Sequence, residues 1–427
     1  MKILHNIGKV SQNPVVRNAS KLLSANVLAQ LLGLLFYPIL TRLYAPADFG
    51  LFNLFIGIGS ILTLFGTAEY HYSIALPKDE DKAVACFHVG MLCLVVVSVL
   101  CGLSSLFSGI IAGWFNTPEL VGVYPLLGLF VFMSGLWNLL NYWLIRQSGF
   151  TRISVYQLTL SGGNVVSKYA FARVGCMQGG LVLGAIVGQV IATVSCLLGK
   201  SRGLLSPLWR VERAAVKTMA MAYRNYPLYS LPRVLINNVG AHLPVLLLTP
   251  VFGTAELGLL GMAITLAFRP INMVVSSLYQ VFLQQSGERL HQCRRISPML
   301  YKYMGRMSLV VLPVFVLLYV VLPDLTGWLL GVEWHTTGVY IRMMLPWLYL
   351  TLLLSPMGHL TDLFMKQRWW LGFEILAFVL RLFGLLLGMW QGSMSATIGY
   401  YCLAGALSYL LQLPCYLYLI RRYEHQL

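Results

Sequence analysis

Residues 83–108 read AVACFHVGMLCLVVVSVLCGLSSLFS, without a single Asp, Glu, Lys or Arg. An α-helix rises about 1.5 Å per residue, so about 20 apolar residues cross the hydrocarbon core of a bilayer. Eleven other apolar stretches, separated by short polar segments, cover residues 22–40, 50–68, 122–142, 154–172, 180–199, 227–250, 257–283, 305–322, 338–358, 371–390 and 394–420. The sequence therefore predicts about twelve transmembrane helices.

The composition points to the same class of protein. Of the 427 residues, 58% are hydrophobic and only 10% are charged, whereas a soluble domain has about 45–50% apolar and about 25% charged residues. So few charges cannot cover a globule of this size with polar surface. We predict an all-α membrane protein without a large soluble domain.

The net charge of +16 is concentrated in the loops on one side of the predicted helices. If both termini are cytoplasmic, 23 of the 30 Lys and Arg residues fall in cytoplasmic segments, and only Arg42 and Arg173 fall in the opposite loops. Cytoplasmic loops of membrane proteins are rich in Lys and Arg. We predict a multi-pass membrane protein with both termini in the cytoplasm, and no nucleic-acid partner is needed to explain its charge.

Two short motifs recur in the chain and indicate an internal repeat. ADFGL at residues 47–51 is followed 208 residues later by AELGL at 255–259, and LIRQ at 144–147 is followed 220 residues later by FMKQ at 364–367. We predict two pseudo-symmetric six-helix bundles around a central cavity, covering 1–200 and 226–427 and joined by a basic cytoplasmic linker, 201–225. Such an arrangement suits alternating access, in which one bundle rocks against the other.

Charged residues inside the apolar stretches are the first candidates for function, because a charge at mid-bilayer costs about 2.5–3.5 kcal/mol on insertion scales. Five are cationic and one is acidic: Lys168, Arg233, Arg269, Arg342, Arg381 and Glu374. This excess of cations predicts a cavity that binds an anion.

Arg269 is the strongest candidate, because it lies about twelve residues into its helix and Pro270 follows it. A proline next to a mid-membrane cation predicts a kinked helix that lines a cavity; the alternative is an Arg that contacts neighbouring carbonyls as structural glue. Arg381 is similarly central, with Glu374 seven residues before it. Arg233 and Lys168 lie nearer to helix ends, where they could bind substrate or extend to the interface, and we expect Arg342 to extend to the interface.

Catalytic and metal-binding signatures are not found. The eight cysteines form no CxxC pair, the histidines are isolated, and GKS at 199–201 lacks the earlier glycine of a phosphate-binding loop. We predict a non-enzymatic protein without cofactor or metal, with possible coupling to an ion gradient or the membrane potential. Glu69 and Glu374 are weak candidates for ion coupling; the alternative for Glu69 is pairing with a loop lysine.

Several segments resemble one family. TRLYAPADFG at 41–50, EY and SIALPK within 69–78, YPLYSLP at 226–232, and RP at 269–270 followed by YQVF at 279–282 are similar to segments of bacterial polysaccharide, O-antigen type, flippases. This family lies within the multidrug/oligosaccharidyl-lipid/polysaccharide superfamily. The fifth apolar stretch departs from the pattern, because Lys168 and Arg173 make it unusually polar.

The resemblance implies twelve helices in two bundles in the bacterial inner membrane, and flipping of a polyprenyl-diphosphate-linked oligosaccharide from the cytoplasmic to the periplasmic leaflet. Arg269 would then bind the diphosphate, helped by Arg381, Arg233 and Lys168. Polar side chains would contact the sugar, among them Asn26, Asn53 and Asn237. The expected partners are this lipid-linked substrate, membrane lipids and polysaccharide polymerase or assembly proteins.

Two other functions remain open from the sequence. An ion-coupled exporter of drugs or small cations would need carboxylates in its cavity. A membrane-embedded glycan polymerase would need a large outer loop, whereas the longest one predicted, about 323–338, offers only Asp324, Glu333 and His335.

Overall fold

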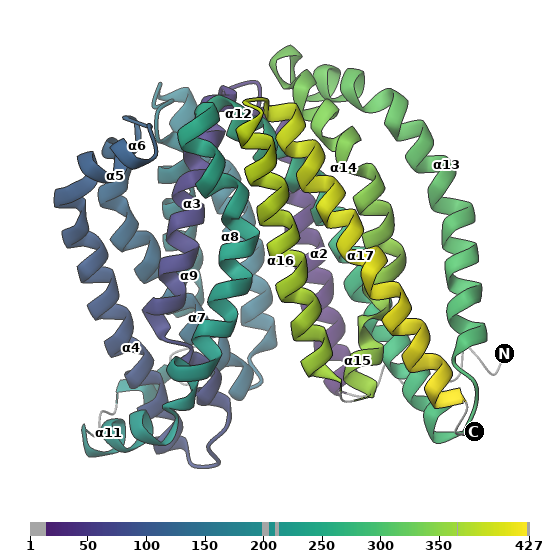
Figure 1. Cartoon of the computed structure of the whole chain (residues 1–427). Coiled ribbons are helices and arrows are strands. Elements are labelled where there is room, and N and C mark those ends of the chain that lie inside the picture. Colours follow the sequence, from purple (N-terminus) through teal and green to yellow (C-terminus); the bar gives the residue numbers. More distant parts are fainter. Residues whose placement is uncertain (1–13, 199–204, 210–212, 365, 425–427) are drawn as a thin grey trace. The chain divides into compact units, whose positions relative to one another are not determined.

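The computed structural model describes residues 14–198, 205–209, 213–364 and 366–424; the side chains of 14–26, 209, 213, 291 and 367–370 are outside this description. The described part is helical and contains no strand (Figure 1). It divides into two compact units, Met1–Thr254 and Ala255–Leu427, called here the first and the second unit. The prediction of an all-α protein is confirmed.

The first unit contains the first crossing of the long helix α12 in addition to the earlier helices. Its helices are α2 (Pro14–Leu40), α3 (Pro46–Thr67), η1 (Tyr70–Ala75), α4 (Glu80–Leu103), η2 (Ser104–Phe107), α5 (Ser108–Trp114), α6 (Leu120–Val123), η3 (Tyr124–Leu126), α7 (Leu127–Arg146), α8 (Phe150–Arg173), α9 (Gly180–Leu197), η4 (Ser206–Trp209), α11 (Arg213–Ala222), η5 (Tyr226–Ser230) and the start of α12 (Leu231–His291).

The second unit begins just after a break in α12. Gly253 has φ 81° and ψ 171°, which are not helical values and which favour glycine. The remaining helices are α13 (Ser297–Leu330), η6 (Val332–Trp334), α14 (His335–Leu354), η7 (Ser355–Gly358), α15 (His359–Leu363), α16 (Gln367–Trp390) and α17 (Met394–Glu424).

The helices match the predicted crossings. Nine segments of the described chain are long and apolar enough to span a membrane, and one of them, Tyr226–Leu290, has 65 residues and is interrupted at Gly253, which gives two crossings. Helices α2, with 27 residues, and α8, with 24 residues, account for the other two predicted stretches. The polar residues of α8, such as Asn164 and Lys168, explain why its apolar signal is weaker.

Glycines of α9 allow α8 to pack closely against it. A Cβ on Gly184 would lie 2.8 Å from the backbone nitrogen of Lys168, and a Cβ on Gly188 would lie 2.7 Å from that of Asn164. Small residues spaced four apart are typical of tight helix packing in membranes. This packing fixes the position of α8, and therefore of Lys168, in the first unit.

Helices α3 and α7 run in the same direction in the first unit. The ring centroid of Phe55 lies 5.5 Å from that of Phe130, and further along both helices His71, just after α3, lies 5.1 Å from Tyr142. The two helices are therefore parallel along this contact.

The second unit repeats this parallel pairing between the second crossing of α12 and α14 with the following helix α15. The Thr337 hydroxyl donates to the Leu259 carbonyl, and further along the Tyr279 hydroxyl donates to Asp362. Tyr279 and Asp362 correspond to His71 and Tyr142 at the 208- and 220-residue offsets of the sequence motifs. The predicted repeat thus has a structural counterpart, whereas the predicted boundaries at 200 and 226 stay a prediction.

The linker predicted over 201–225 lies partly outside the described residues. In its described part, the Tyr70 hydroxyl donates to the carbonyl of Ala220 in α11 at 3.0 Å, and Leu205 is buried in the same apolar core as Ile74 and Trp143. The described part of the predicted linker therefore packs against the first unit.

Candidate functional site

Lys168 of α8 contacts α3 and the turn that precedes it in the first unit. Its Nζ atom lies 4.1 Å from the ring centroid of Phe52 in α3, and its carbonyl oxygen accepts a hydrogen bond of 2.7 Å from the Tyr44 hydroxyl. The side chain is half-buried, as is Asn53, the residue after Phe52. A cation over an aromatic face is attracted by the ring quadrupole. The amine is therefore directed toward α3.

Arg233 and Asn237 lie on the first crossing of α12, where both are exposed. They are four residues apart and so share one face of the helix. This crossing runs antiparallel to α3: the Ser60 hydroxyl lies 2.8 Å from Nε2 of His242, while near the start of α12 Tyr226 stacks on Tyr72 with 6.2 Å between ring centroids. The arrangement places the start of α12 beside the residues that follow α3.

Glu69 is the buried acid at this junction. Its side chain is only 1% exposed, and Glu69 and Ala68 both have left-handed backbone angles, with φ of 64° and 45°. Burial raises the pKa of the Glu69 carboxyl above its usual value, while Arg233 and a hydrogen bond from Ser230 lower it. The Oε2 atom has no hydrogen-bond partner.

Aromatic rings surround the Glu69 junction. Tyr72 lies 4.3 Å from His71 and 5.0 Å from Tyr142 between ring centroids, and Tyr142 is within electrostatic reach of the Glu69 carboxyl. Nδ1 of His71 lies 2.9 Å from the Thr67 hydroxyl, and burial lowers the pKa of this histidine to about 4. His71 is therefore neutral near pH 7.

Arg269 lies on the second crossing of α12 and is exposed, as is Pro270. The preceding residue, Phe268, packs against Trp347 of α14 with 4.8 Å between ring centroids. The backbone through Pro270 keeps helical angles, because the break in α12 is at Gly253. The helix was expected to kink beside Arg269, but its break lies earlier in the chain.

Arg381 is half-buried in α16 and has two contacts in the second unit. Its Nε donates to the Ala377 carbonyl at 3.0 Å, and its side chain also bonds to the Tyr401 hydroxyl. The ring centroids of Tyr401 and Trp347 are 5.3 Å apart. Because Trp347 also packs against Phe268, a group of aromatic rings connects Arg381 with the residue that precedes Arg269. Glu374 is exposed on the same helix.

Arg342 and Asn26 are the remaining predicted residues. The Arg342 guanidinium lies 5.4 Å from the ring centroid of Tyr319. The side chain of Asn26 lies outside the described residues. The first unit thus holds Lys168, Asn53, Arg233, Asn237 and Glu69, and the second unit holds Arg269, Arg381 and Glu374. No group of three His, Cys, Asp or Glu suited to a metal occurs in the part of the chain that the structure covers.

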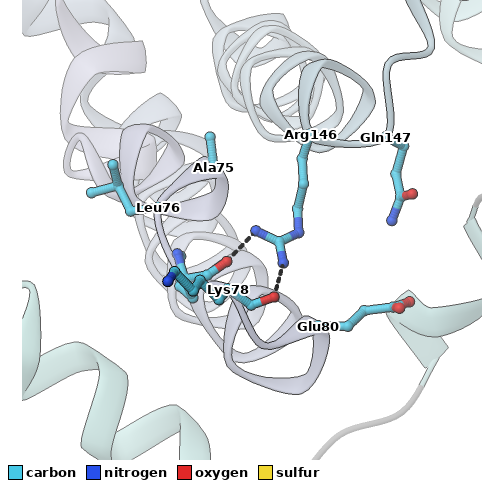
Figure 2. Close-up of a pocket in the computed structure, with 7 residues that line it drawn as sticks. Ala75, Leu76, Lys78, Glu80, Arg146 and Gln147 are labelled. Atoms are coloured by element: carbon cyan, nitrogen blue, oxygen red, sulfur yellow. Dashed lines mark hydrogen bonds between the residues drawn. The ribbon is translucent and has the colours of Figure 1, made fainter.

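Sequence reasoning missed the role of Arg146 at the end of α7. Its guanidinium donates to the carbonyls of Lys78 at 3.1 Å, Asp79 at 3.3 Å and Ile74 at 3.4 Å, and also to that of Pro77. Figure 2 shows the side chain pointing at this loop, where it lines a pocket of about 490 Å³. The LIRQ motif at 144–147 could have pointed to Arg146, because it places a basic residue at the end of a helix that belongs to the internal repeat.

Comparisons with known proteins identify both a family and a fold. A family model described as "Polysaccharide biosynthesis protein" matches residues 39–338. The inward-facing structure of a multidrug resistance MATE family transporter of the MOP superfamily aligns with a TM-score of 0.71 and 14% identity, over 93% of this chain and 96% of that one. The lipid II flippase MurJ, in an inward closed conformation, aligns with a TM-score of 0.68 and 11% identity, over 94% of this chain and 89% of that one.

A comparison with curated proteins gave no significant match. Because the identities to the solved structures are low, their similarity establishes the fold alone. That fold confirms the predicted class, an all-α membrane protein with about twelve transmembrane helices.

Proposed function

The chain belongs to the family of polysaccharide biosynthesis proteins, and from this premise we propose that it is a flippase for a polyprenyl-diphosphate-linked oligosaccharide. The substrate is a repeat unit of O-antigen, capsule or exopolysaccharide. It moves from the cytoplasmic to the periplasmic leaflet of the inner membrane by alternating access. The lipid II flippase MurJ, whose fold is similar, supports a lipid-linked substrate.

The observation that carries this proposal is the excess of cations within the membrane spans. Lys168, Arg233, Arg269 and Arg381 lie in crossings from both units, whereas Glu374 is the one acid within the predicted stretches. A diphosphate carries several negative charges, and guanidinium groups bind phosphate oxygens through paired hydrogen bonds. We assign the diphosphate to these four residues, and the sugar to amides such as Asn53 and Asn237.

The direction of transport follows from the charge of the substrate and from the orientation that the basic loops favour. An inside-negative membrane potential favours outward movement of an anionic group by about 2.3 kcal/mol per charge per 100 mV. The energy source is therefore a gradient or the potential.

Replacement of Arg269 tests the proposal. Arg269→Ala is expected to reduce delivery of the lipid-linked glycan to the outer leaflet at unchanged protein level, and Arg269→Lys to retain part of it, because a point charge replaces a fork of donors. Arg342→Ala is the matched control, since this arginine is not assigned to the substrate. Normal delivery by Arg269→Ala would overturn the assignment of Arg269.

A second candidate function is export of a drug or small cation, which the buried Glu69 carboxyl favours. The purified protein in liposomes distinguishes the two. Efflux of cationic dyes without any transfer of lipid-linked glycan would favour the exporter.

A further inference from the structure

The Glu69 carboxyl occupies a site that is costly for an isolated negative charge. It is 1% exposed, and Oε2 has no hydrogen-bond partner. An ionised carboxylate in such surroundings needs a compensating cation, or else it binds a proton. Two consecutive left-handed residues, Ala68 and Glu69, set the direction of the chain here. The backbone therefore holds this side chain in an unfavourable position for a carboxylate.

A hydrogen bond from Ser230 stabilises the Glu69 carboxylate in part, and one charged residue supplies further compensation. His71 on η1 is neutral near pH 7. The rings of Tyr72, Tyr142 and Tyr226 pack around the junction. Arg146, the cation at the end of α7, is directed to the carbonyls of the 74–79 loop. Arg233 is the charged group that acts on the Glu69 carboxyl.

Arg233 is near Glu69 but not locked to it. The described part of the chain contains ion pairs at Lys82 with Asp79 and at His335 with Asp324, whereas Glu69 and Arg233 are not within 4.0 Å of each other. Arg233 is exposed while Glu69 is buried. The guanidinium can therefore reach an external anion without breaking a close salt bridge, and its departure would leave the Glu69 charge uncompensated.

We propose that Arg233 exchanges anionic partners, stabilising the Glu69 carboxylate in the empty protein and the substrate diphosphate in the loaded one, and that Glu69 binds a proton in the loaded state. This inference rests on the proposed function. No covalent bond other than the O–H bond of the protonated carboxyl is formed. Binding of one substrate then takes up one proton, and release returns it. The proton therefore crosses in the same direction as the substrate, and the inside-negative potential acts on the negative charge that remains.

The first experiment tests the link between Arg233 and Glu69 without substrate. Infrared difference spectra of the purified protein in nanodiscs follow the carbonyl band of protonated carboxylic acids during a pH titration, and Glu69→Gln identifies the band of this residue. Arg233→Gln should keep Glu69 protonated to higher pH, whereas Arg224→Gln, an exposed arginine near the same junction, should leave the titration unchanged. An unchanged titration in Arg233→Gln would overturn the inference, whatever the substrate.

The second experiment measures binding of a polyprenyl diphosphate to the same nanodiscs at several pH values. For the wild type, the Kd should weaken as pH rises, by up to about tenfold per pH unit, because a proton must be bound together with the ligand. Glu69→Gln should bind tightly at every pH, because Arg233 no longer has a competing partner. Glu80→Gln, an exposed acid of the same unit, should behave as the wild type.

The two experiments separate failure of the inference from failure of the proposed function. If the diphosphate binds but Glu69→Gln keeps the wild-type pH dependence, the exchange is wrong and the flippase proposal stands. If Arg233→Gln changes the Glu69 titration but no form of the protein binds the diphosphate, the substrate assignment is wrong, and the exchange with substrate falls with it.

Discussion

Gly50 of α3 faces Thr254 of α12 at backbone contact: a Cβ on residue 50 would lie 1.8 Å from the carbonyl oxygen of Thr254. No side chain can relieve that overlap, because the obstacle is backbone. The close approach lets α3 lie against α12 immediately after the break at Gly253. The contact lies within the ADFGL motif, which accounts for the glycine in that motif.

We predict that Gly50→Ala destabilises the protein by about 1–3 kcal/mol, the usual range for overpacking. Thermal unfolding of the purified protein measures the effect. Gly102→Ala is the matched control, because a Cβ on this helical glycine meets nothing within 4 Å. That variant should be neutral or slightly stabilised, since alanine favours a helix over glycine. Equal stability of the two variants would show that α3 and α12 can separate at this point.

Arg146 gives a second prediction about stability. Replacement by Ala removes donors from the carbonyls of Ile74, Pro77, Lys78 and Asp79. A lost hydrogen bond to a charged group costs about 1.5–3 kcal/mol, and the half-buried loop cannot recover all of these bonds from water. We expect Arg146→Ala to unfold more easily and to be cleaved faster by protease near residue 78. Arg146→Lys should be intermediate, and Arg224→Ala should match the wild type.

The membrane helices could be predicted from the sequence because each crossing must be apolar along its whole length. The arrangement of the candidate site was harder to predict from the sequence. Arg233 and Glu69 are 164 residues apart and share no motif, and the left-handed turn at Ala68 carries no glycine that would mark it. The contacts of Arg146 are with backbone carbonyls, which any residue supplies. The pattern therefore predicted which charges lie in the membrane, but not which acid faces which base.

Protonation of His71 should limit stability in acid. Burial lowers the pKa of this histidine to about 4 in the folded protein, compared with about 6.5 when unfolded. The unfolded chain thus binds more protons between these values, so stability is fully present above about pH 6.5 and is lost as pH falls toward 4, by up to about 1.4 kcal/mol per pH unit. His71→Gln should lose less stability in this interval, as measured by thermal unfolding at several pH values. Replacement of the exposed His335 by Gln controls for general effects, and a parallel loss of stability in His71→Gln and the wild type would contradict the prediction.

Lys168 allows a structural role to be separated from a role in transport. Its amine lies 4.1 Å from the Phe52 ring centroid, and this attraction contributes about 0.5–2 kcal/mol. The bond from Tyr44 to the carbonyl of residue 168 does not depend on the side chain.

We therefore expect Lys168→Met, which keeps the apolar stem, to fold with at most a small loss of stability. If Lys168 also contacts the diphosphate, delivery of lipid-linked glycan by this variant should fall by about tenfold or more, because a charge-assisted contact contributes about 1.5–3 kcal/mol. Lys168→Arg should retain much of the delivery, because it keeps the charge. Delivery is compared per folded protein, with Phe52→Leu as the control that removes the ring and keeps the amine. If Lys168→Met and Phe52→Leu lose stability equally and deliver normally, Lys168 only joins α8 to α3, and the diphosphate is held by the arginines alone.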